Sequence, residues 1–128
     1  MPAHCYDYAV IRVVPRVERE EFINAGVILS CQERDFLAAL VELPEARLRA
    51  LDGAADVAAV RRHLESIPVI CAGGAAAGAI GQLTRRERFH WLVAPRSTLI
   101  QTSAVHTGCC VDLQQTLERL LTVLVRGS

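Results

Sequence analysis

The sequence predicts an α+β fold, an antiparallel β-sheet with helices packed on one face. Three strand-like segments follow one another in the first third of the chain, separated by short polar turns, as in a meander. Segments with apolar residues three and four positions apart then predict helices. A fourth strand-like segment returns before the last helix, and strands followed by helices are typical of this class.

The three strands of the meander are expected over Tyr8–Val14, Phe22–Cys31 and Phe36–Leu43. The first is apolar on both faces, as a central strand should be, with Arg12 as its one exception. Pro15 ends it, because proline has no N–H to donate to a neighbouring strand.

Two helices are expected next, a short one over Glu45–Leu51 and an amphipathic one over Asp56–Ser66. Pro68 is predicted to mark the end of the second helix, because the residue before a proline is disfavoured in the helical conformation. The segment Ala72–Gly81 has low complexity and is interpreted as a loop.

The last third of the chain is expected to contain a helix, the returning strand and a final helix. Thr84 and Glu87 fit a capping box, which predicts a helix over Arg85–Val93. The alternation in Thr98–Val105 predicts the fourth strand. Asp112 is expected to cap a closing helix with a stripe of leucines.

Composition bounds the class of protein. With 128 residues, of which 52% are hydrophobic, the chain fits a single domain over 1–128. All 14 basic residues are arginine and balance 14 acidic ones, which argues against a mainly electrostatic grip on nucleic acid. The five cysteines are irregularly spaced and no secretory signal is recognisable, so we expect free thiols, no membrane segment and a cytoplasmic location.

Arg12 and Asn24 are polar residues within apolar strands. The structural interpretation of Arg12 is a buried ion pair with Glu21 or Glu42, and the functional one is an anion-binding arginine in a pocket. Asn24 needs hydrogen-bond partners, supplied by the fold or by a ligand, and Gly26 beside it suggests a bulge or a close backbone approach.

A second polar cluster lies on and around the fourth strand, and polar groups that converge at a strand end are a common site. If this strand pairs with the first, Arg12 could share its pocket; the alternative is a solvated face. The members of the cluster are Arg96, Ser97, Gln101, Ser103, His106 and Thr107.

No catalytic motif is identifiable. Ser103 and His106 lack a recognisable carboxylate partner. The glycine-rich segment Ala72–Gly81 lacks the Gly-Lys-Ser/Thr sequence that ends a phosphate-binding loop. Cys109 and Cys110 lack the spacing of a metal site, so no metal and no cofactor is expected. Arginines between Arg85 and Arg96, interleaved with Phe89 and Trp91, could bind single-stranded nucleic acid or could simply face water around buried rings.

Two blocks, YAVIRVVPRVEREEFINAGVIL and RFHWLVAPRSTLIQTSAVHTG, resemble the bacterial family known as domain of unknown function 3037. The residues that match its pattern include Arg12, Glu21, Asn24 and the cluster around the fourth strand; the sequence departs from the pattern at Ala104 and Leu113, where proline is expected. The resemblance implies no established activity. It implies a partner-binding role, because members are often encoded beside kinases similar to those of bacterial persistence modules.

The leading hypothesis is therefore a small accessory or binding module. It would bind a protein partner, such as a kinase-like one, or a small anionic ligand held by Arg12 and Arg96. The first alternative is an enzyme of unassigned class that acts on a phosphorylated or nucleotide substrate, with Glu21 or His106 as general base. The second is nucleic-acid binding.

Overall fold

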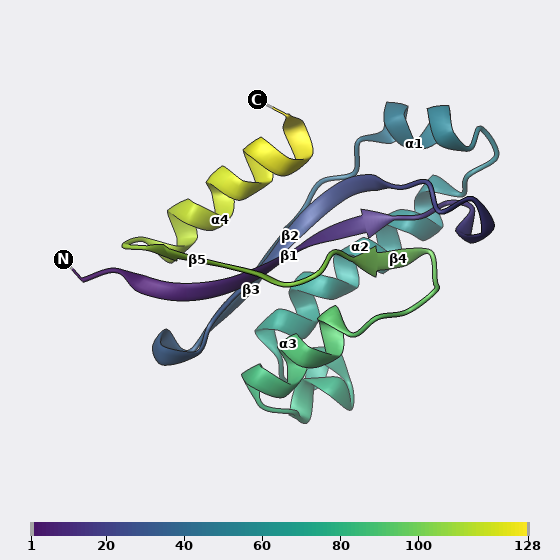
Figure 1. Ribbon diagram of the computed structural model, residues 1–128. Helices are drawn as coiled ribbons and strands as arrows, with labels where there is room; N and C mark the ends of the chain where they lie inside the picture. The colour runs from purple at the N-terminus through teal and green to yellow at the C-terminus, as the bar shows by residue number, and fades with distance from the viewer. Residues whose placement is uncertain (1, 128) are drawn as a thin grey trace.

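The computed structural model describes residues 2–127 and contains a five-stranded antiparallel sheet (Figure 1). Strands β3 (Phe36–Val41), β2 (Ile23–Cys31) and β1 (His4–Val13) lie side by side in that order. Beyond β1 lie two short strands, β4 (Ile100–Thr102) and β5 (His106–Cys110). The α+β class, the three-stranded meander and the return of a later strand beside β1 are confirmed.

Helices cover both faces of the sheet, which corrects the expectation that they pack on one. Helices α2 (Val57–Ala72) and α3 (Arg85–Val93) lie on one face, and α4 (Leu113–Leu121) lies on the other (Figure 1). Helix α1 (Glu45–Leu51) contributes Leu48 to the core that α2 and α3 cover. The reason is the composition of β2. Its consecutive residues Val27, Ile28 and Leu29 are fully buried and point alternately to the two faces, so both faces need a cover.

A bulge in β2 determines which face each of its residues meets. Ile11 pairs with Gly26 and Arg12 pairs with Asn24, so Ala25 is the extra residue. Asn24 consequently lies on the same face as Val27, the face of α4. Glycine is required at position 26, because a Cβ there would lie 2.6 Å from the carbonyl oxygen of Leu40 on β3.

The chain segment beside β1 is interrupted between β4 and β5, where a single strand over Thr98–Val105 was expected. β4 pairs with Ile11–Val13 and β5 with His4–Tyr8, so both lie on the same edge of β1. At the interruption, Ser103 Oγ accepts a hydrogen bond of 2.9 Å from Val10 N, and Ser103 N donates one of 2.9 Å to Val10 O. The buried serine thus satisfies the backbone of β1 where strand pairing fails.

Helix α2 continues through Pro68 to Ala72, so the expected end near Ser66 is corrected. An interior proline removes one helical hydrogen bond and costs about 3 kcal/mol. Ile67 and Cys71 on either side of it are buried in the core, and their burial offsets that cost. The helix ends at Ala72, and the N–H of the following Gly73 donates to the carbonyls of Val69 and Ile70. The chain then leaves the helix through the positive φ of 75° at Gly73, which glycine adopts without strain.

Strand β1 begins at His4, four residues before the expected Tyr8, and the other boundaries lie close to the expected ones. Helix α1 has the expected bounds, the Thr84–Glu87 capping box begins α3, and Asp112 caps α4 by accepting from Gln115 N. Helix α4 is extended by a short π-helix, η5 (Thr122–Arg126). Four 3-10 turns lie in the connections: η1 (Val17–Arg19), η2 (Gln32–Arg34), η3 (Ala75–Ala77) and η4 (Ile80–Gln82). Across residues 2–127, the helices are too short or too polar to cross a membrane.

We predict that Ser103→Ala lowers the free energy of unfolding by about 1–3 kcal/mol, because the buried Val10 N–H loses its acceptor. Urea denaturation followed by circular dichroism measures the change. Ser97→Ala is the matched control, because Ser97 is exposed in the preceding loop. Equal unfolding midpoints for the two variants would contradict the role given to Ser103.

Candidate functional site

Arg12 does not form the expected ion pair. Glu21 pairs with Arg19, and Glu42 accepts hydrogen bonds from Arg126, the shortest of 2.8 Å. The half-buried guanidinium of Arg12 instead lies over the ring of Phe22, with Cζ 4.1 Å from the ring centroid. This cation–π contact stabilises the positive charge of Arg12, which has no carboxylate partner among the described residues.

Arg12, Asn24 and Gln101 form a row across three neighbouring strands, because Arg12 pairs with Asn24 on one side and with Gln101 on the other. The amide of Asn24 donates to Leu124 O in η5, and that of Gln101 donates to Thr98 O. Arg12 Nε and Asn24 Oδ1 are buried with no hydrogen-bond partner among the described residues. The row therefore retains one buried donor and one buried acceptor without a partner among the described residues.

The cluster around β4 divides into separate surroundings. Arg96 donates to Trp91 O, stacks on the Trp91 ring at 4.7 Å and lines a mostly apolar pocket of about 310 Å³ with Gln101. Ser97 is exposed in the loop before β4, and the hydroxyl of Ser103 accepts a hydrogen bond from the backbone of β1. His106 on β5 pairs with Tyr8 on β1, and the centroids of their rings lie 5.3 Å apart.

The returning segment does lie beside β1, as expected, but the side chains of the predicted site are spread along the length of the strands. Tyr8, the partner of His106, precedes Arg12 by four residues, which is about 13 Å along a strand. Glu21 is held by Arg19 in the connection between β1 and β2. The residues of the enzymatic alternative therefore do not gather at one point.

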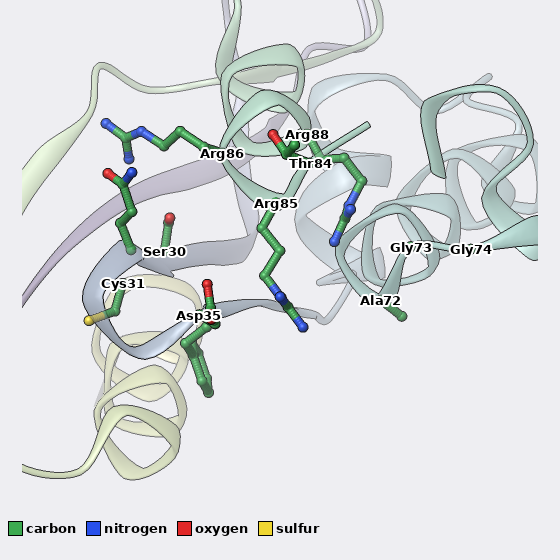
Figure 2. Close-up of a pocket in the computed structure, with 12 residues that line it drawn as sticks. Ser30, Cys31, Asp35, Ala72, Gly73, Gly74, Thr84, Arg85, Arg86 and Arg88 are labelled. Carbon is green, nitrogen blue, oxygen red and sulfur yellow. The ribbon is translucent and has the colours of Figure 1, made fainter. Parts of the chain in front are cut away.

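A larger pocket, of about 640 Å³, lies where the start of α3, the end of α2 and the β2–β3 turn meet (Figure 2). We call it the arginine pocket, because Arg85, Arg86 and Arg88 line it together. Thr84 also lines it, and so do Gly73 and Gly74. Figure 2 shows the side chain of Arg85 extending between Asp35 on one side and the glycines on the other.

Arg88 is the structural anchor of this pocket and is only 6% exposed. Its guanidinium donates to Leu83 O at 2.6 Å and to Cys71 O at 3.2 Å. A Cβ on Gly73 would lie 2.9 Å from Arg88 Cζ, so glycine allows the guanidinium to pack against the backbone. Arg88 Nε is buried with no partner among the described residues.

The glycine-rich segment that precedes α3 has a defined structure of two 3-10 turns, closed by a hydrogen bond from Gly74 N to Gly81 O. A Cβ on Gly81 would lie 2.0 Å from Gly74 O, so this closure requires glycine. The N–H groups of Gly73 and Gly74 are used inside the protein. The segment therefore shapes the pocket wall and does not act as a phosphate-binding loop.

The arginine pocket has a surplus of positive charge. Arg86 forms a 3.3 Å ion pair with Asp7, while Arg85 has no ion pair within residues 2–127. Asp35 is the one carboxylate in the pocket wall. The first turn of α3 adds the positive end of a helix dipole. This arrangement can bind an anion, and within the described residues no cluster of metal-binding side chains accompanies it.

The sequence pointed to this helix without identifying the pocket. Its arginines were expected to face water and its rings to be buried, whereas Arg88 is buried and Trp91 is 39% exposed. Phe89, at 1% exposed, and Arg85, which is exposed, behave as expected. The signal in the sequence was the succession of a glycine-rich segment, a capping box and three arginines within four positions.

We predict that Arg88→Met lowers the free energy of unfolding by about 1–3 kcal/mol, because two carbonyl groups lose their donor. Arg85→Met, on the same helix but exposed, should change it by less than about 0.5 kcal/mol. Urea denaturation of both variants tests the difference. If Arg88→Met is as stable as the natural protein, Arg88 is not the anchor of the pocket.

Comparison with known proteins gives one family match. No curated protein and no solved structure matches the chain. The model of a family described as "Protein of unknown function (DUF3037)" matches residues 8–125. This range includes all of β2 to α4 and most of β1, and it covers both the arginine pocket and the row of Arg12, Asn24 and Gln101. The chain belongs to this family.

Proposed function

We propose that the protein is a non-catalytic binding module that holds the phosphoryl group of a small ligand in the arginine pocket. The observation that carries the proposal is the presence of three arginines in the lining of one pocket, with a single carboxylate in its wall. Arginine suits this ligand, because its planar fork can donate two parallel hydrogen bonds to phosphate oxygens.

The three arginines would have different tasks. Arg88 is fixed by two carbonyl groups and supplies charge without moving. Arg85 is exposed and has no carboxylate partner in the described chain, so it is available to close on a ligand. Arg86 would exchange or share its contact with Asp7, which is 3.3 Å away and partly exposed.

The proposed ligand site is the arginine pocket, and not the pair Arg12 and Arg96 that the sequence suggested. Arg96 lines a different and largely apolar pocket, and Arg12 lies against Phe22. The pocket volume of about 640 Å³ falls in the range typical of small-molecule sites, so a nucleotide or a sugar phosphate would fit. A kinase-like protein partner is a separate proposal that rests on the family resemblance alone.

Titration with inorganic phosphate and with ADP, followed by backbone amide NMR, tests the proposal. We expect shifts at Thr84–Arg88 and Gly73–Gly74, and at least a tenfold loss of affinity in the double variant Arg85→Gln/Arg86→Gln. Arg62→Gln is the matched control, because Arg62 is an exposed arginine on α2 outside the pocket.

Two results would overturn the proposal. One is the absence of saturable shifts at the pocket with either ligand. The other is equal affinity of the double variant and the natural protein, provided that both give the same far-ultraviolet circular dichroism. Sodium chloride at matched ionic strength distinguishes a specific phosphate site from general screening of charge.

A further inference from the structure

Cys5 and Cys109 face each other across two antiparallel strands at the end of the sheet opposite β4. They are direct partners in the register of β1 and β5, and their Sγ atoms are 3.0 Å apart. Directly opposed residues in an antiparallel pair have Cα atoms about 4.5–5.5 Å apart, which lies within the range that a disulfide spans. Both cysteines are exposed.

The other three cysteines are placed differently. Cys110 follows Cys109 in β5 and therefore points to the opposite face, where it packs against the core beneath α4. Cys31 is buried at 1% exposure. Cys71 is buried in the other core, and burial raises the pKa of its thiol to about 12, so it stays protonated and unreactive near neutral pH.

We propose that Cys5 and Cys109 are a redox modification site that forms a reversible cross-strand disulfide by exchange with a small-molecule disulfide. The thiolate of one cysteine attacks a sulfur of the small disulfide, forms a mixed disulfide and releases one small thiol. The thiolate of the second cysteine then attacks the protein sulfur of that mixed disulfide and releases the second small thiol. The two protein thiols lose two protons and two electrons, and the small disulfide is reduced to two thiols.

A disulfide between Cys5 and Cys109 would strengthen a weakly held end of the sheet. His4, Cys5 and Tyr6 pair with β5, whereas the pairing of β1 with β2 begins only at Asp7 (Figure 1). β5 pairs with β1 alone. This two-stranded end therefore depends on a single ladder, and Tyr6 within it belongs to the core beneath α4. A disulfide between Cys5 and Cys109 would bind the two strands covalently and close a loop of about 100 residues.

The hydrogen bond with Cys5 raises the pKa of the Cys109 thiol. Less Cys109 thiolate is therefore present at neutral pH, and we expect the exchange to accelerate as the pH rises.

The test is incubation of the reduced full-length protein with oxidised glutathione, followed by intact-mass measurement and peptide mapping without reduction. We expect a protein that has lost two hydrogens, with Cys5 and Cys109 in one cross-linked pair and Cys31 and Cys71 still reduced. The melting temperature should rise by roughly 5–10 °C on oxidation and return when a thiol reductant is added.

Matched single variants separate the alternatives. Cys110→Ser should retain the bond and the rise in melting temperature, whereas Cys5→Ser and Cys109→Ser should each stop at the mixed disulfide with glutathione. The proposal fails if the natural protein also stops at mixed disulfides, links Cys109 to Cys110, or forms dimers through Cys5. Circular dichroism of each variant shows that the fold is kept, and phosphate binding plays no part in the readout.

Discussion

The antiparallel pairing of β1 on both of its edges holds the rest of the molecule in place. On one side it pairs with β2 over seven positions, and on the other it pairs with β4 and β5, which arrive from late in the sequence. The β4–β5 segment is connected to α3 at one end and to α4 at the other. Its pairing with β1 therefore fixes the helix that carries the arginine pocket and the helix that covers the opposite face of the sheet.

The protein accommodates partly buried positive charge in two ways that both depend on arginine. Arg12 lies over an aromatic ring, and Arg88 donates to backbone carbonyls at the end of α2 and before α3. Neither uses a carboxylate. A guanidinium is planar and more weakly hydrated than an ammonium group, so it can be placed against a ring or a glycine backbone at a lower desolvation cost. Lysine at position 88 could not reach two separate carbonyls with the same fixed geometry.

Local signals in the sequence were sufficient for most elements. Apolar runs separated by polar turns identified β1 to β3, and the Thr84–Glu87 and Asp112–Gln115 caps fixed the starts of α3 and α4. The second face of the sheet was also readable from the consecutive buried residues of β2, although the expectation placed the helices on one side. Pro68 misled because a local rule for helix ends was overridden by burial of the residues around it.

The features that the sequence could not supply depend on contacts between distant segments. β5 is short and polar, and it is a strand only because the start of β1 lies beside it. The arginine pocket needs the β2–β3 turn, the end of α2 and the start of α3 to meet, and no spacing along the chain encodes that meeting. The predicted ion pair of Arg12 with Glu21 or Glu42 was wrong, because Arg19 pairs with Glu21 and Arg126 pairs with Glu42.

The interruption at Ser103 also bears on how this molecule behaves among its neighbours. An outer strand with a long, regular row of unpaired N–H and C=O groups invites another chain to add to the sheet, which is a route to aggregation. Here that border is divided into runs of three and five residues, with an irregular step between them. A second chain could not follow both runs in one straight register, so the same serine that completes the ladder internally also makes this border a poor template for further growth.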